Sequence, residues 1–102
     1  EGAWVEIERE RLYQSYMGAL FRLAEMHLQA GEFESALQYC QRALKEDPCQ
    51  EDAHRVAMRV YAAMGNRALV IRQYEQCCQA LLDEVDALPS YQTKVLYESL
   101  IK

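Results

Sequence analysis

Apolar residues recur at steps of three and four along nearly the whole chain, which is the spacing of one buried face of an α-helix. The segment 53–64 keeps this spacing until Gly65 interrupts it. Pro48 and Pro89 mark two further interruptions, because a proline disfavours helix in the residue before it. The expected helices cover about 4–31, 33–47, 53–65, 69–82 and 90–102. The sequence therefore predicts an all-α fold of antiparallel helical hairpins with short connections.

Two glycines, Gly31 and Gly65, are 34 residues apart, which is the period of a tetratricopeptide (TPR) repeat. Glycine suits the turn between the two helices of such a unit because it adopts backbone angles that other residues avoid. The spacing predicts two TPR-like repeats, at about 17–50 and 51–84, and a final helix at about 90–102. A plain helical bundle whose glycines match by chance is the alternative. The second unit departs from the repeat pattern at Met58, Val70 and Leu82.

Four longer stretches follow one another in a recognisable order. They are AWVEIERERLY at 3–13, AGEFESALQYCQRALKEDP at 30–48, EDAHRVAMRVYAAMGNRALVIRQYEQC at 51–77 and LPSYQTKVLYESLI at 88–101. Together they resemble the bacterial transcriptional activator domain, the TPR-like module of SARP-type transcriptional regulators. The resemblance covers nearly all of the 102 residues. One departure lies at Asp86, where the family usually has glycine.

The resemblance implies a protein–protein interaction and self-association module that regulates an upstream winged-helix DNA-binding domain. The chain begins at Glu1 rather than at methionine, and we expect residues 1–102 to be one TPR-like helical domain, a fragment of a longer regulator. The expected partners are other domains of the same regulator or a second copy in a homodimer. A stand-alone TPR adaptor that binds a peptide from an unrelated protein is the alternative, and sequence upstream of Glu1 would distinguish the two.

Composition limits the remaining function classes. The formal net charge of −5 argues against a nucleic-acid-binding domain, although residues 53–74 contain four arginines and no acid. No segment approaches the length of a membrane span, and no secretory signal is visible, so we expect a cytoplasmic protein without membrane contact. The histidines and cysteines lack metal-ligand spacing, and no catalytic constellation or phosphate-binding loop is present. We therefore expect no enzyme activity, no metal and no cofactor.

The helical register predicts a groove along the first helix of each repeat unit. Three guanidinium groups on one face of this groove would clamp carboxylates or phosphates of a partner. The competing interpretations are a solvated face, or an Arg55 that pairs with nearby acids such as Asp52. The residues expected to form the partner-binding groove are Arg22, Glu25, Gln29, Arg55 and Arg59, with Ala63 beside them.

Three aromatic residues are candidates for contacts with another domain or a second copy: Trp4, Tyr91 and Tyr97. Trp4 precedes any complete hairpin, and the two tyrosines lie on an amphipathic terminal helix. The four cysteines leave a thiol-based redox sensor as a second alternative function. Their expected role is that of small apolar side chains in a reduced protein.

Overall fold

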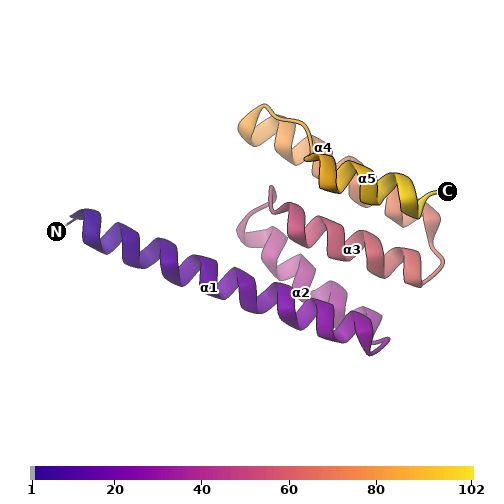
Figure 1. Cartoon of the computed structure of the whole chain (residues 1–102), viewed down its shortest axis with the longest axis horizontal. Coiled ribbons are helices and arrows are strands. Elements are labelled where there is room, and N and C mark those ends of the chain that lie inside the picture. Colours follow the sequence, from indigo (N-terminus) through magenta and orange to yellow (C-terminus); the bar gives the residue numbers. More distant parts are fainter. Residues whose placement is uncertain (1) are drawn as a thin grey trace.

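The computed structural model describes residues 2–102, and these form five α-helices joined by short connections (Figure 1). The helices are α1 (Gly2–Gln29), α2 (Phe33–Glu46), α3 (Glu51–Ala63), α4 (Arg67–Val85) and α5 (Tyr91–Leu100). The predicted all-α fold is confirmed. Within the described residues, none of the helices combines the length and the apolar composition that crossing a lipid bilayer requires.

The turns after α1 and α3 have the same hydrogen bonds, displaced by 34 residues. The amide of Gly31 donates to the carbonyl of Leu28, and the amide of Gly65 donates to that of Ala62, both at 3.0 Å. The two glycines have φ of 76° and 75°, in the left-handed region where a side chain would be strained. Glycine is thus required at both turns, which is why the repeat is visible in the sequence.

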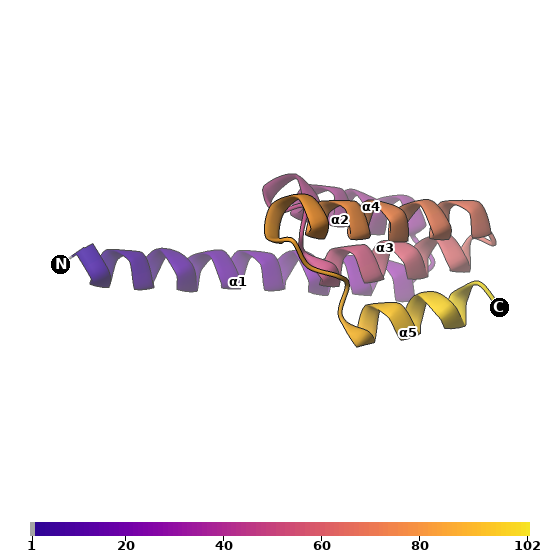
Figure 2. The ribbon, with the colours of Figure 1, turned by 90° about the horizontal axis from the view of Figure 1, so that it is seen from above.

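The helices form two layers. Figure 2 shows α2 and α4 in one layer, and α1, α3 and α5 in the other. Each of α1 and α3 pairs with the helix that follows it, and α5 takes the third place in its layer, in contact with α3 and α4. The core lies between the layers and repeats every 34 residues. Pairs of buried residues at this offset are Ala24 and Met58, Ala36 and Val70, and Ala43 and Cys77.

The link between α4 and α5 uses two local signals. Asp86 ends α4 in the left-handed conformation, with φ 51° and ψ 49°. This is the position where the resembled family has glycine, so the backbone geometry is kept although the residue differs. Ser90 then caps α5, because its side chain accepts a hydrogen bond from the amide of Thr93. The link directs α5 back along α4.

The first part of α1 extends beyond the rest of the molecule (Figures 1 and 2). Helix α1 has 28 residues against 14 in α2, so its first half has no helix beside it. We call residues 2–12 the α1 arm. Apolar side chains on the arm are exposed, among them Trp4, Ile7 and Leu12. The helix passes through Gly18 without a break.

Candidate functional site

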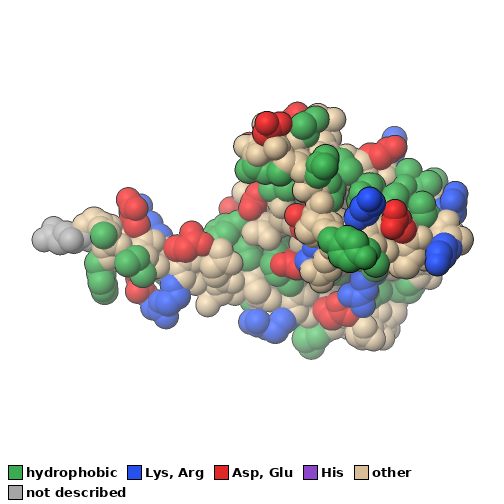
Figure 3. All heavy atoms as spheres, turned by 45° about the horizontal axis from the view of Figure 1, so that its top comes forward, with side chains coloured by type: hydrophobic (Ala, Val, Ile, Leu, Met, Phe, Trp, Pro, Cys, Tyr) green, Lys and Arg blue, Asp and Glu red, His purple; other side chains and the backbone are tan. Residues whose placement is uncertain are grey.

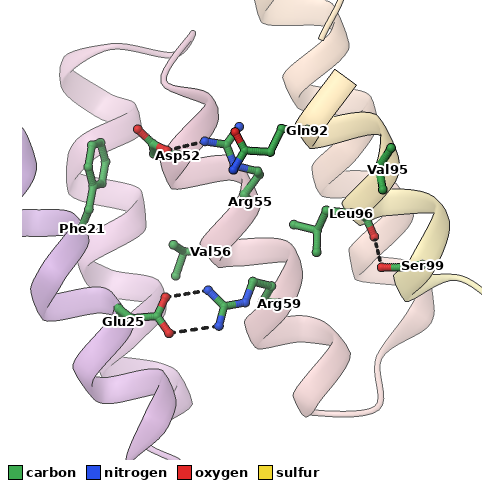
Figure 4. A pocket seen from close by; sticks show the side chains of 10 residues that line it. All are labelled: Phe21, Glu25, Asp52, Arg55, Val56, Arg59, Gln92, Val95, Leu96 and Ser99. Carbon is green, nitrogen blue, oxygen red and sulfur yellow. Dashed lines mark hydrogen bonds and ion pairs between the residues drawn. The ribbon is translucent and has the colours of Figure 1, made fainter. Parts of the chain in front are cut away.

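A hollow of about 660 Å³ opens between α1, α3 and α5, on the face of the layer that these three helices form (Figure 4). We call it the α1–α3–α5 hollow. Helix α3 supplies its centre, while α1 and α5 supply its two sides. The residues that line it are Phe21, Glu25, Asp52, Arg55, Val56, Arg59, Gln92, Val95, Leu96 and Ser99. Three of the residues expected in the groove, Glu25, Arg55 and Arg59, are in this lining, and α5 adds a wall that the sequence did not indicate.

Arg59 is held by Glu25 across the hollow. Its Nη1 donates to Oε1 of Glu25 at 2.5 Å and its Nη2 donates to Oε2 at 3.0 Å, which is the bidentate geometry of a guanidinium on a carboxylate. The hydrogen bonds from Arg59 are the main reason that the pKa of Glu25 lies below its usual range, and a hydrogen bond from Gln29 adds to the effect. The carboxylate stays charged, so the pair is closed at neutral pH.

Glu25 and Arg59 are 34 residues apart and therefore occupy the same position in successive repeat units. Stacking of the units brings equivalent positions of α1 and α3 together, and opposite charges at this offset then form an ion pair. Both side chains remain about one third exposed, at 38% and 36%, so the pair stabilises the fold only modestly.

Arg55 fixes α5 to α3. Its Nη1 donates to the hydroxyl of Thr93 at 2.7 Å, and that hydroxyl donates to Oε1 of Glu51 at 2.6 Å. The same carboxylate oxygen accepts the amide of Ser90 at 2.9 Å, while Nη2 of Arg55 pairs with Asp52. Thr93 is fully buried, so this network forms the contact between the start of α5 and α3.

The pKa of Glu51 reports the strength of this network. Burial of the carboxyl alone would raise its pKa, but hydrogen bonds from Thr93 and Ser90 and the charge of Arg55 outweigh burial and hold the pKa below its usual value. Neither arginine of the hollow has a free guanidinium, because each is already bound to carboxylates of this chain. The competing interpretation of the sequence, in which Arg55 pairs with Asp52, is therefore correct for Arg55.

The rest of the lining of the hollow is largely apolar. Figure 4 shows Leu96 of α5 directed toward α3, with Val56 on the side of α3 toward α1 and Phe21 on α1. Val95 lies at the rim and is 42% exposed. The arrangement offers apolar contact between two sets of internally paired charges, which suits an apolar side chain from a partner better than a carboxylate.

Two of the predicted groove residues lie outside the hollow. Arg22 is exposed on α1 and is not part of the lining, because the hollow meets α1 at Phe21 and Glu25, one helical turn apart. Gln29 is exposed as well and contributes only through its hydrogen bond to Glu25 at 2.8 Å. The structure does not bring either residue into the hollow, and Ala63 is likewise absent from its lining. That Arg22 and Gln29 contact a partner stays a prediction.

Residues 1–101 match the family model described as "Bacterial transcriptional activator domain". The chain belongs to this family. It matches no curated protein and no solved structure. The family is one of transcriptional regulation rather than a known enzyme family, and the resemblance found in the sequence is confirmed.

The three aromatic candidates of this bacterial transcriptional activator domain have different surroundings. Trp4, on the α1 arm, is 68% exposed, and Tyr91, at the start of α5, is 81% exposed. Tyr97 instead stacks on Tyr74 of α4, with ring centroids 3.9 Å apart and planes 4° from parallel. Trp4 and Tyr91 therefore offer open surface, whereas one face of Tyr97 is used within the fold.

Two of the four cysteines and one of the two histidines are built into the core. Burial raises the pKa of Cys40 and of Cys77 to about 12, so both remain protonated thiols. Burial lowers the pKa of His54, whose Nδ1 accepts from Gln73 at 2.7 Å and whose Nε2 donates to the carbonyl of Pro48 at 2.8 Å. Within residues 2–102, no group of three or more His, Cys, Asp or Glu side chains is suited to hold a metal ion.

The sequence did not indicate the wall that α5 contributes, because nothing in it placed α5 against α3. The residues of this wall are Gln92, Val95, Leu96 and Ser99. The link from Glu25 to Arg59 did have a signal, because opposite charges occupy one repeat position at an offset of 34. Thr93 had none, since a threonine in an amphipathic helix is unremarkable until its neighbours are known.

Proposed function

We propose that this domain is the protein-interaction module of a bacterial transcriptional activator. Its α1–α3–α5 hollow receives a segment of a neighbouring domain or of a second copy, and this contact sets the activity of an upstream winged-helix DNA-binding domain. The observation that carries the proposal is the hollow itself, formed on one layer by the first helix of each unit and by α5. Such a regulator acts in the cytoplasm, where its promoter lies.

The chemistry of the hollow defines its guest. Because Arg59 is bound by Glu25 and Arg55 by Asp52 and Thr93, an anionic guest would have to displace ion pairs that already exist. An apolar side chain needs no such exchange and gains from leaving water. We therefore expect a helix or an extended segment that inserts one or two apolar side chains against the apolar lining of the hollow, with polar groups at the paired charges.

The α1 arm supplies a second contact surface. Trp4, Ile7 and Leu12 are each at least 60% exposed on a helix that has no neighbour there. Exposed tryptophan is unfavourable in water and is enriched at protein interfaces. Figure 3 shows hydrophobic side chains on the protruding arm, clear of the main body. This arm would pack against the neighbouring domain or the second copy.

The test uses the regulator of which this domain is part, with Val95→Lys at the rim of the hollow. Val95 is partly exposed, so the substitution should leave the helical content unchanged. A lysine there would block entry of an apolar side chain, and we expect loss of transcription from the target promoter. Sedimentation of the same variant reports whether a second copy is the partner.

Met26→Lys is the matched control, because Met26 is 65% exposed on α1 but lies outside the hollow. Promoter activity and mass in solution that are identical for the Val95 variant, the control and the unmodified regulator would refute the role of the hollow. A stand-alone adaptor would instead have no winged-helix sequence upstream of Glu1.

A further inference from the structure

A second hollow, of about 480 Å³, lies between α4 and α5. We call it the α4–α5 hollow. At one end the stacked rings of Tyr74 and Tyr97 join the two helices. The residues that line it are Tyr74, Glu75, Cys78, Gln79, Leu82, Ala87, Leu88 and Tyr97.

The repeat shows what kind of element fits this hollow. A third hollow, of about 370 Å³, is flanked by α2 and α4 and has residues of α3 between them. On α2 it is lined by Leu37, Cys40, Gln41, Leu44 and Lys45. Adding 34 to the last four numbers gives Tyr74, Glu75, Cys78 and Gln79, which are four of the five residues that α4 contributes to the α4–α5 hollow; the fifth is Leu82. The face of α4 that borders the α4–α5 hollow is therefore equivalent to the face of α2 that looks toward α4.

It follows that a helix in the α4–α5 hollow would lie beside α4 as α4 lies beside α2, with α5 in the role of α3. This is the position of the second helix of a third unit. The surface is apolar enough to bind one, because Leu82 and Leu88 are 53% and 84% exposed and Val85 lies near them at the end of α4. The guest must then present an apolar stripe.

The charge around the hollow selects the polar face of the guest. Residues 73–92 contain four carboxylates and no lysine or arginine. They are Glu75, Asp83, Glu84 and Asp86. Among the ion pairs within residues 2–102, none involves these four side chains. Figure 3 shows hydrophobic and acidic side chains together over the end of α4 and the loop after it.

We propose that the α4–α5 hollow binds an amphipathic helix of a partner protein, with leucine-like residues on one face and lysine or arginine beside them. A second copy that binds through this same face fits poorly, because it would bring the same four carboxylates against their equivalents. Nucleic acids and anionic membranes are repelled by the same charge. This proposal is independent of the one for the α1–α3–α5 hollow.

The probe is a synthetic peptide of about 18 residues, made of Leu, Ala and Lys with one leucine stripe. Two further peptides serve as controls: one has Glu in place of Lys, and the other has the same composition in an order without a stripe. Fluorescence anisotropy gives the affinity of each, and amide chemical-shift changes locate the peptide. We expect the basic striped peptide alone to bind, with shifts confined to α4, α5 and their connecting loop.

Two variants test the recognised groups. The double substitution Leu82→Ser with Leu88→Ser should lower the affinity for the basic peptide about tenfold, because the exposed leucines are lost while the core is untouched. The double substitution Glu75→Lys with Asp83→Lys should lower the affinity for the basic peptide by a similar factor and allow the peptide with Glu in place of Lys to bind. Met26→Ser is the apolar control and Glu34→Lys the charge control, since both lie on the first hairpin, and neither should change the affinity.

Several results would overturn the proposal. Equal binding of all three peptides would show nonspecific adhesion, and shifts confined to the α1–α3–α5 hollow would place the guest elsewhere. An unchanged affinity in the double leucine variant would mean that Leu82 and Leu88 are not used. A dimer by sedimentation that dissociates in the same variant would assign this face to a second copy.

Discussion

Thr93 connects α5 to α3, and its replacement by valine tests how much this connection stabilises the fold. The hydroxyl of Thr93 accepts from Nη1 of Arg55 at 2.7 Å and donates to Oε1 of Glu51 at 2.6 Å, in a site with no solvent exposure. Thr93→Val replaces the hydroxyl by a methyl group of similar size. Both hydrogen bonds are lost, and two charged partners are left facing an apolar atom.

The expected loss can be worked out from these two bonds. A hydrogen bond to a charged group contributes about 1.5–3 kcal/mol. Arg55 retains Asp52 and Glu51 retains the amide of Ser90, so neither charge is left without a partner. We therefore expect Thr93→Val to lower the free energy of unfolding by about 2 kcal/mol rather than by the sum of two bonds. That is a large part of the total of about 5–15 kcal/mol typical of a small protein.

Urea unfolding followed by circular dichroism measures this difference directly. Thr93→Ser is the control, because serine keeps the hydroxyl and loses only a methyl group, at a cost of about 1 kcal/mol. We expect the serine variant to be the more stable of the two. A valine variant equal to or more stable than the serine variant would refute it, since the hydroxyl would then contribute nothing.

Three further predictions concern single positions. Burial lowers the pKa of His54, so the unfolded chain takes up the proton first as the pH falls through 6.5. The free energy of unfolding should therefore decrease below that pH. Measured at about pH 7.5 and 5.5, this decrease should be smaller in His54→Gln than in the unmodified protein. Asp86→Gly should raise the melting temperature and increase the free energy of unfolding by about 1 kcal/mol, because glycine removes the strain of a left-handed residue. Asp86→Asn removes only the charge and should give a smaller increase. Arg59→Glu should destabilise by about 1 kcal/mol through repulsion of Glu25, and adding Glu25→Arg should restore stability, as thermal denaturation of the three proteins would show.

The sequence predicted those features that depend on local chemistry. The apolar spacing predicted the helices, and the turn glycines Gly31 and Gly65 have the positive φ that their position in a repeat requires. Ser90 was a candidate N-cap from its place after Pro89, and its side chain does accept the amide of Thr93. Each of these depends on a few neighbouring residues, so the chain itself carries the information.

Features that depend on packing between distant segments were not predictable in the same way. Arg55 and Thr93 are separated by 38 residues, and their contact depends on the angle at which α5 returns along α4. The sequence placed arginines on one face of a groove and offered Asp52 as a possible partner of Arg55, but it did not decide between a paired and a free guanidinium, and it did not identify Glu25 as the partner of Arg59. Whether an arginine is free to bind a guest is a property of its neighbours in space, and the helical register of its own segment does not determine it.

Helix α5 is a wall of both hollows. Val95, Leu96 and Ser99 face the α1–α3–α5 hollow, while Tyr97 faces the α4–α5 hollow. Its first turn is held by the buried hydroxyl of Thr93, whereas its end is joined to α4 by a bond of 3.0 Å from Nε of Arg67 to the carbonyl of Ile101. A guest in one hollow that favours one placement of α5 changes the shape of the other hollow. Such coupling is reciprocal. A partner bound in the α4–α5 hollow would then change the affinity of the α1–α3–α5 hollow for its guest by some factor, and that guest would change the affinity of the α4–α5 hollow for its partner by the same factor.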